Sequence, residues 1–250
     1  MLVTGTIALN GDGSVRSYTI DRSDRLPTSV TTAIQNALPG WKFQPPEGHP
    51  DGVSGKMTLR MLARPIDAKT DRVTIGGASF FDEPTNWHLT YKTREQPYFP
   101  TMALQVRESG AVYLLLRVGR DGHVQEAFVE QVNLDAYASP QLMKRLRQLF
   151  ADSATDAARR WTFNVPTQGR TADAPFWYAR VPVTYFLAVW GKPLPDTYGQ
   201  WQAYVPGPRL KAPWAIPGES TKAPSSDAMM AGALHEPGGL LQLKSTLNGE

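Results

Sequence analysis

The residues able to do acid–base or nucleophilic chemistry are scattered along this chain. Its four histidines are His49, His88, His123 and His235, and no pair has the spacing of a zinc-protease or EF-hand motif. There is no cysteine, which excludes disulfides, thiolate catalysis and cysteine-ligated metal sites. The sequence therefore predicts no metal site, and we expect no cofactor.

Other patterns that can indicate catalysis also have simpler explanations. No Gly-x-Ser-x-Gly phrase occurs, so the nucleophile turn of the α/β-hydrolases is not expected. Residues 11–13, Gly-Asp-Gly, are too short for a phosphate-binding loop and no lysine follows them. Glu126 and Glu130 share one face of a predicted strand, which we interpret as a solvated face rather than a catalytic pair. We therefore expect that the protein is not an enzyme.

An internal repeat organises the elements that must position any binding site. The copies begin at residues 5–21 and 110–130, and each reads as a strand, an Asp-Gly turn and a second strand. Gly13 and Gly122 supply the positive φ that a tight hairpin turn needs. A helix and a third strand follow in each copy. The predicted order is therefore strand, hairpin, strand, helix, strand, twice over.

The helix of each copy is predicted from apolar residues at helical spacing. In the first copy these residues run from Val30 to Trp41. In the second copy, residues 139–140, Ser-Pro, form a cap and a first-turn proline, and an apolar stripe covers residues 142–150. We expect residues 152–153, Asp-Ser, to break this helix and a short second helix to follow.

Each helix leads into a Trp-x-Phe phrase whose aromatic residues we expect in the core. These residues are Trp41 and Phe43 in the first copy, and Trp161 and Phe163 in the second. Third strands are predicted over residues 56–63 and 181–189, where apolar side chains alternate. Three antiparallel strands packed on one helix make a two-layer module, so the predicted fold class is α+β.

The chain is expected to divide into two small modules, a connecting segment and a tail. The modules are predicted at residues 1–65 and 96–190, joined by residues 66–95, where residues 76–77, Gly-Gly, suggest a turn. Proline and glycine number 21 each, well above average usage. They are concentrated in residues 191–250, which we expect to be an extended arm. One short helix is predicted there, over residues 227–235.

The composition of the chain limits the classes of protein to which it can belong. The chain has 250 residues, 41% hydrophobic and 20% charged, which is typical of a globular protein. Its net charge of +3 is too small to indicate nucleic-acid binding. No apolar run reaches the ~18 residues of a membrane-spanning helix. The chain opens directly on a predicted strand, so we expect any targeting segment or membrane anchor to lie outside it.

The second copy carries short phrases in a specific order. They are Gln96 to Pro100 (Gln-Pro-Tyr-Phe-Pro), Gly110-x-Val112, Arg120-Asp-Gly122-x-Val124, Arg160-Trp161-x-Phe163 and Val181-Pro-Val183. In this order and spacing, residues 96–189 resemble the TonB C-terminal domain family. The first copy, residues 2–64, resembles it more weakly and lacks the opening helix. We interpret the chain as two tandem copies, of which the first is degenerate.

The resemblance implies a periplasmic protein of a Gram-negative cell envelope with a role in transport. TonB links an inner-membrane motor to outer-membrane transporters, and its C-terminal domain binds a transporter peptide as a strand beside the last strand of the sheet. Carried over to this chain, the partner-binding residues are Gln96, Pro97, Tyr98, Phe99 and Pro100 in the opening phrase, and Val181, Val183, Thr184, Tyr185, Phe186 and Leu187 in the last strand.

The chain departs from the family in three ways. The 250 residues hold neither a membrane anchor nor a long proline-rich spacer, the second helical region is longer than usual, and about sixty residues follow the second module. These departures put energy transduction in doubt, and the function we expect is that of a protein-binding or adaptor protein. Its partner is expected to be a transporter peptide or another envelope protein.

Strand addition has a physical basis that does not depend on the resemblance. The edge strand of a small sheet displays unpaired N–H and C=O groups, which an extended partner can satisfy. Pro182 removes one donor from the last predicted strand, and prolines favour guarded edges. The alternative is that the first copy, the segment around Trp87 or the tail already occupies this edge.

Two other functions remain open from the sequence. One is a periplasmic immunity or inhibitor protein that neutralises an enzyme or effector. Its interface would be formed by the extra helix of the second copy and by a tail surface with Trp190, Trp201 and Trp214, since large aromatics dominate interface energetics. The other is a structural subunit of an envelope complex, whose tail lies along a neighbouring subunit.

Overall fold

The computed structural model describes residues 1–46, 48–68, 70–81, 88–168, 171–187, 196–215, 226–236 and 241–247. The structure is α+β with antiparallel sheets, as predicted. The strands are β1 (Leu2–Leu9), β2 (Val15–Ile20), β3 (Val53–Pro65), β4 (Asp71–Phe81), β5 (Thr90–Thr93), β6 (Gly110–Gly119), β7 (Val124–Leu134), β8 (Thr162–Asn164) and β9 (Phe176–Tyr185). The α-helices are α1 (Thr28–Ala37), α2 (Thr101–Gln105) and α3 (Pro140–Ala158), and the 3-10 turns are η1 (Ser23–Arg25), η2 (Leu38–Gly40) and η3 (Ser226–Ala228).

The first sheet has four strands in the order β2-β1-β3-β4, one more than predicted. The extra strand, β4, lies in residues expected only to connect the two copies. Gly76 and Gly77 are inside this strand rather than in a turn. Gly76 is the additional residue of a β-bulge, because Arg60 pairs with Gly77 and Met61 pairs with Ile75. A glycine is favoured at such a bulge. The pair Gly76 and Gly77 therefore marks a bend within β4 rather than a turn between two elements.

The second sheet has the three predicted strands, in the order β7-β6-β9. Its last strand begins five residues earlier than expected and ends at Tyr185, and residues 188–189 lie outside the described residues. Trp177 and Tyr178, at the start of β9, are both less than 8% exposed. Because the strand is covered on both faces, simple alternation could not locate its start.

Helix α3 runs unbroken for 19 residues, so the break predicted at Asp152 and Ser153 is wrong. The carboxylate of Asp152 accepts a hydrogen bond from Gln148 Nε2, one turn earlier, at 2.7 Å. Ser153 is fully buried and its hydroxyl donates to the carbonyl oxygen of Tyr98. These two polar side chains have partners that leave the helix intact, and the apolar stripe continues to Ala158.

Both copies close their hairpin in the same way. Gly13 and Gly122 have φ values of 80° and 76°. Their carbonyl oxygens accept hydrogen bonds from the backbone N–H of Phe43 and Phe163, each at 2.8 Å. The Trp-x-Phe aromatic residues are buried in the two cores, as predicted. The hairpin turn and the exit from each helix therefore hold one another in place.

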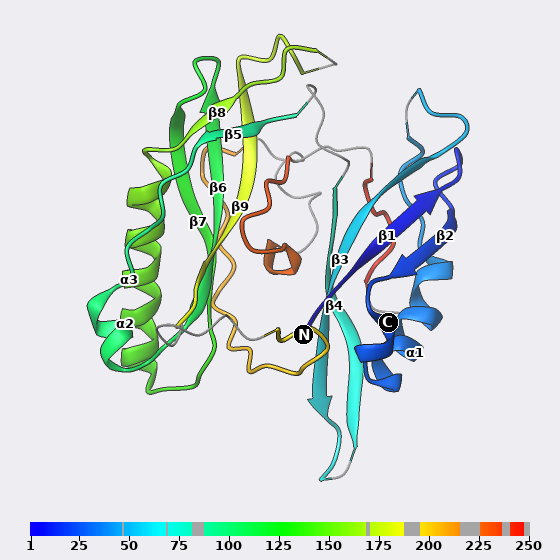
Figure 1. Cartoon of the computed structure of the whole chain (residues 1–250), viewed down its shortest axis with the longest axis horizontal. Helices are drawn as coiled ribbons and strands as arrows, with labels where there is room; N and C mark the ends of the chain where they lie inside the picture. Colours follow the sequence, from blue (N-terminus) through cyan, green and yellow to red (C-terminus); the bar gives the residue numbers. More distant parts are fainter. Residues whose placement is uncertain are drawn as a thin grey trace.

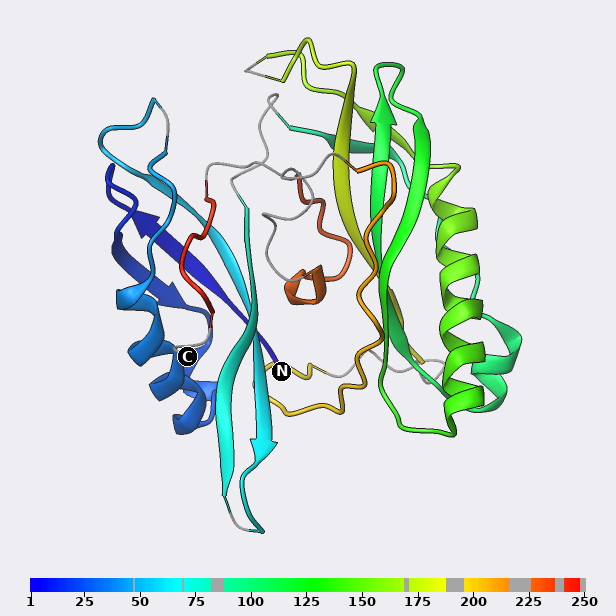
Figure 2. The same ribbon diagram turned by 180° about the vertical axis from the view of Figure 1, so that it is seen from behind.

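The two sheets face each other, and the tail lies between them (Figure 1). Helix α1 covers the outer face of the first sheet and α3 covers the outer face of the second, as the reverse view also shows (Figure 2). The turn η3 contacts β3 and β4 of one sheet and β7 and β9 of the other. It is the only helical turn over residues 226–236, where a short helix was predicted.

None of the helices in the described ranges combines the length and the apolar composition required to cross a membrane.

The hairpin glycines lead to a direct stability prediction. A Cβ atom at position 122 would lie 2.2 Å from the carbonyl oxygen of Phe163, at a φ that favours glycine. We expect Gly122→Ala to lower the free energy of unfolding, measured with urea, by at least about 2 kcal/mol. The control is Gly40→Ala, where no atom lies within 4 Å of the added Cβ, and it should change stability by less than about 0.5 kcal/mol. Equal effects at the two positions would contradict this account.

Candidate functional site

The outer edge of β9 is the predicted site of strand addition. The hydrogen bonds of β9 to β6 and to the tail show which of its residues direct their backbone groups outward. The opposite edge of β9 pairs with β6 along its whole length. Arg180 and Pro182 direct their backbone groups away from β6, toward residues of the tail. Because backbone direction alternates along a strand, Thr184 also directs its N–H and C=O away from β6.

Part of this edge is occupied by the protein's own tail. Arg180 N–H donates to the carbonyl oxygen of His235 at 2.7 Å, and His235 N–H donates to the carbonyl oxygen of Arg180 at 3.0 Å. Gly232 N–H donates to the carbonyl oxygen of Pro182 at 3.0 Å. The alternative that the tail covers the edge is therefore correct for the middle of β9. We call residues 232–235 the strap.

The end of β9 extends beyond the strap. Thr184 is the exposed residue of this strand, and no backbone hydrogen bond joins its outward side to another described residue. Phe186, two residues further, is 44% exposed, while Leu187 is partly buried. Of the predicted strand residues, Val181, Val183 and Tyr185 direct their side chains into the core. A partner at this edge would meet the backbone of Thr184 and the ring of Phe186.

The opening phrase packs beside this end of β9, as the prediction requires. The ring of Phe99 makes edge contacts with Phe150 of α3 and with Tyr185 of β9, with centroid distances of 5.9 and 5.7 Å. Pro100 is buried, Pro97 is partly buried and Gln96 is exposed. The side chain of Tyr98 is 56% exposed. The structure thus brings the two predicted groups of site residues together.

Tyr185 anchors the end of the strand to the helix. Its hydroxyl donates to the carbonyl oxygen of Phe150 at 3.2 Å. Burial raises the pKa of the Tyr185 hydroxyl to about 12, so the group remains a donor at neutral pH. The ring also lies 4.5 Å from the ring of Phe150. The strand next to Thr184 is therefore attached to α3 through Tyr185.

The opposite edge of the second sheet, on β7, also carries a segment of the tail. Leu134 and Val205 exchange two backbone hydrogen bonds, at 3.0 and 2.9 Å. Leu210 N–H donates to the carbonyl oxygen of Glu130 at 2.8 Å. Arg147 of α3 closes over this segment by donating to the carbonyl oxygen of Val205. This edge is not open to a partner strand over these positions.

The tail tryptophans do not gather into one described surface. Trp214 stacks on Tyr178 of β9, with centroids 5.9 Å apart and an interplanar angle of 25°. Trp201 is 41% exposed. Trp190 lies outside the described residues. Of the two described tail tryptophans, Trp201 therefore presents the larger free surface.

Asp227 is the centre of a buried polar layer between the sheets that was not predicted. It is 1% exposed. Its carboxylate accepts hydrogen bonds from the Tyr204 hydroxyl and from Arg209 Nη2, the latter at 3.0 Å. Its carbonyl oxygen accepts two hydrogen bonds from Arg60 of β3, at 3.0 and 2.6 Å. One tail residue therefore joins the tail to the first sheet.

A second buried charge pair lies within the second sheet. Arg180 and Glu130 form two hydrogen bonds, at 2.8 and 2.9 Å, with side chains only 4% and 12% exposed. The prediction of a solvated face is therefore wrong for Glu130. The partner of Glu126 is Arg117, at 3.6 Å, on a more exposed part of the sheet. Each of the two carboxylates is therefore paired with an arginine.

His235 occupies a third buried polar position, in the strap itself. Its side chain is packed edge-on to Phe81, with ring centroids 4.8 Å apart, and Nδ1 lies 3.2 Å from the hydroxyl of Ser79. Burial, together with the nearby charge of Arg180, lowers the pKa of His235 to about 4. The imidazole is therefore neutral at pH 7.

The sequence pattern of β3 did not show whether the polar face of this strand would be covered by another segment. Lys56, Thr58 and Arg60 alternate with core residues along β3, which is also the pattern of a strand with one face in water. In the structure this face meets the tail. Among the described residues, no group of three or more histidine, aspartate or glutamate side chains could hold a metal ion.

Comparison with known proteins does not add to this picture. No protein-family model matches the chain. No curated protein is similar to it in sequence.

The buried charge pair leads to a prediction about its two partners. Glu130→Leu leaves the Arg180 charge buried without its carboxylate, and we expect a loss of about 3–5 kcal/mol in the free energy of unfolding. Adding Arg180→Met removes the stranded charge and should recover most of that loss. Urea unfolding of both single variants and of the double variant measures this coupling. If the double variant loses as much as the sum of the two single variants, the pair is not coupled.

The lowered pKa of His235 predicts a loss of stability in acid. Below pH 6.5 the unfolded chain binds a proton at this residue, whereas the folded chain excludes it until the pH is about 4. This contribution is therefore complete above pH 6.5 and is lost as the pH falls from 6.5 to 4. Between pH 7 and pH 5 we expect the loss to be about 2 kcal/mol.

The measurement compares urea unfolding of the wild type and of His235→Asn at pH 7 and pH 5. The difference in the free energy of unfolding between the wild type and His235→Asn should be smaller at pH 5 than at pH 7 by the predicted amount. The control is His123→Asn, in the exposed hairpin of the second copy, and it should retain the full pH dependence. The prediction is contradicted if the free energies of unfolding of the wild type and of His235→Asn differ by the same amount at both pH values.

Proposed function

We propose that this chain is a TonB-like protein-binding or adaptor protein of the periplasm. It captures an extended segment of an envelope protein, such as an outer-membrane transporter peptide, as a strand added to β9. The observation that carries the proposal is that β9 already accepts strand-type backbone pairing from residues 232–235. This edge is therefore able to bind an extended chain.

Three further features support this site. Thr184 directs its backbone groups outward at a position the strap does not reach. The rings of Phe186 and Tyr98, 44% and 56% exposed, are close in sequence to Tyr185 and Phe99, which are in contact. The order of the phrases in the second copy resembles the TonB C-terminal domain. The partner either pairs with the end of β9 beside the strap or displaces the strap.

The alternative of an immunity or inhibitor protein draws less support. Its proposed tail interface needs several exposed tryptophans, whereas the ring of Trp214 is stacked on Tyr178. The structural-subunit alternative needs a tail that extends to a neighbouring subunit. Residues 204–210 and 232–235 are instead paired with the protein's own second sheet. Neither alternative has an observation in its favour as specific as the pairing at β9.

Substitution at Thr184 tests strand addition. Thr184→Pro removes the outward N–H donor but no hydrogen bond to β6, and Pro182 shows that the strand tolerates proline at this orientation. Thr184→Ala removes the same side chain and keeps the donor. The immobilised full chain is incubated with a detergent-solubilised envelope extract of a Gram-negative cell, and the captured proteins are quantified by mass spectrometry.

We expect Thr184→Pro to reduce capture of the main partner at least tenfold, and Thr184→Ala to capture it like the wild type. Strand addition at β9 is wrong if the proline variant captures at full strength. It is also wrong if both variants lose the partner equally, since that result indicates a side-chain contact.

A further inference from the structure

Exposed apolar side chains gather around the short helix α2. Among the described residues, ten large hydrophobic side chains are exposed, and five of these belong to α2, to residues next to it in sequence or to the loop before α3. Isolated exposed apolar residues are ordinary, whereas a group of them marks an interaction surface. The five residues, which we call the α2 patch, are Tyr98, Met102, Leu104, Val106 and Tyr137, and they are between 38% and 79% exposed.

One end of the α2 patch is attached to the middle of α3. The Ser153 hydroxyl donates a hydrogen bond to the carbonyl oxygen of Tyr98. The next residue, Phe99, packs its ring 5.9 Å from that of Phe150. Within α2, Ala103 is the buried residue that faces the core. The backbone is therefore fixed, while the side chains on either side of Ala103 remain exposed.

The other end of the α2 patch is attached to the loop before α3. The carboxylate of Glu108 accepts hydrogen bonds from the backbone N–H groups of Asp135 and Ala136, at 3.0 and 2.9 Å. These bonds bring Tyr137, 79% exposed, beside the C-terminal end of α2. Helix α2 thus runs along the first turns of α3, and both views show it on the outside of that helix (Figure 1 and Figure 2).

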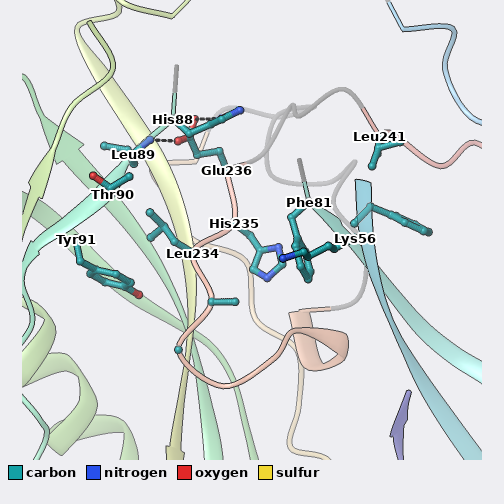
Figure 3. Close-up of a pocket in the computed structure, with 13 residues that line it drawn as sticks. Lys56, Phe81, His88, Leu89, Thr90, Tyr91, Leu234, His235, Glu236 and Leu241 are labelled. Atoms are coloured by element: carbon teal, nitrogen blue, oxygen red, sulfur yellow. Dashed lines mark hydrogen bonds and ion pairs between the residues drawn. The ribbon is translucent and has the colours of Figure 1, made fainter. Parts of the chain in front are cut away.

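The α2 patch differs from the other apolar surface near the tail, which is enclosed. A cavity of about 390 Å³ lies between the first sheet, the segment leading into β5 and the strap, and its lining includes Leu234 and His235. Figure 3 shows Leu234 and Phe81 on opposite sides of this cavity. Helix α2 instead projects from the periphery of the molecule (Figure 2). A projecting apolar surface encloses no small ligand, so it fits the surface of something larger.

Arg107 places a positive charge at the end of α2 in a conformation that favours glycine. Its φ is 56°. The N–H groups of Arg107 and Glu108 donate to the carbonyl oxygens of Leu104 and Ala103, so this residue closes the helix. Its side chain is exposed and belongs to none of the ion pairs of the described residues. A strained residue at an exposed position points to a role for its side chain, which here is a charge.

Two further cations lie on the part of α3 that α2 runs along. Lys144 and Arg145 are exposed, and neither belongs to an ion pair in the described part of the chain. The carboxylates in residues 101–109 and 135–146 are Glu108, which is buried and bonded to backbone N–H groups, and Asp135, which is exposed. The exposed charge beside the C-terminal end of α2 is therefore positive overall.

We propose that the α2 patch docks the protein on the surface of a bilayer that contains anionic phospholipids. Met102, Leu104 and Val106 enter the boundary between the headgroups and the acyl chains, and the two tyrosines lie at the level of the headgroups. The three cations pair with lipid phosphates. A second copy of the chain fits the α2 patch less well, because its own patch carries the same positive charge. This surface does not depend on strand addition at β9.

Flotation of the full chain with lipid vesicles tests the proposal. We expect binding to vesicles of equal parts phosphatidylglycerol and phosphatidylcholine, and at least fivefold weaker binding to phosphatidylcholine alone. The double variant Met102→Ser/Leu104→Ser should bind the anionic vesicles at least tenfold more weakly. The matched control is Ile66→Ser, directly after β3, where the side chain is 57% exposed. It should bind like the wild type.

A second variant separates the charge from folding. Glycine is favoured at the φ of residue 107, so Arg107→Gly should not lower the free energy of unfolding measured with urea. Its binding to the anionic vesicles should nevertheless fall about fivefold.

Several results would overturn the proposal. These are a wild type that does not float with anionic vesicles, equal binding to phosphatidylcholine alone, an Arg107→Gly variant that binds like the wild type, or an Ile66→Ser variant that loses as much binding as the double variant. Sedimentation velocity without lipid provides a further check. A wild-type dimer that becomes monomeric in Met102→Ser/Leu104→Ser would show that a second copy covers the α2 patch, and it would overturn the proposal as well.

Discussion

The burial of Asp227 between the two sheets is the constraint on which the rest of the arrangement depends. A carboxylate that is 1% exposed is stable only if charged and hydrogen-bonding partners replace water around it. The carboxylate accepts from Tyr204 and Arg209 of the tail, and Arg60 of β3 donates to the backbone carbonyl oxygen of the same residue. Because these groups meet at one point, η3 is held in contact with β3 and β4 of the first sheet and with β7 and β9 of the second.

The same tail determines which parts of the second sheet can bind a partner. It pairs with β7 around Leu134 and with β9 at Arg180, so both edges carry backbone hydrogen bonds to the tail. Unpaired edges promote aggregation, and covering them is a common protection. The outward backbone of Thr184 has no backbone hydrogen bond to another described residue, and it lies beside the aromatic contact of Phe99 and Tyr185. This end of β9 is where we propose that a partner strand binds.

The two copies share one hydrogen bond between the hairpin turn and the segment after the helix, and they differ in the elements around it. In each, a glycine of the hairpin accepts a hydrogen bond from the phenylalanine that follows the helix. The first copy adds β4 to its sheet, whereas the second copy adds the turns of α3 beyond Asp152 and the pair β5 and β8.

The sequence by itself determined the order of the strands and helices within each copy, the hairpin turns at Gly13 and Gly122, and the burial of the Trp-x-Phe aromatic residues. These features follow from local backbone preferences and from the period of apolar residues. Only the tertiary structure decided that Gly76 bulges a fourth strand, that Glu130 is buried against Arg180, that His235 lines a cavity, and that the tail covers part of β9. The physical reason is that a period of two identifies a polar face of a strand, but does not say whether that face meets water or the polar side chains of another segment.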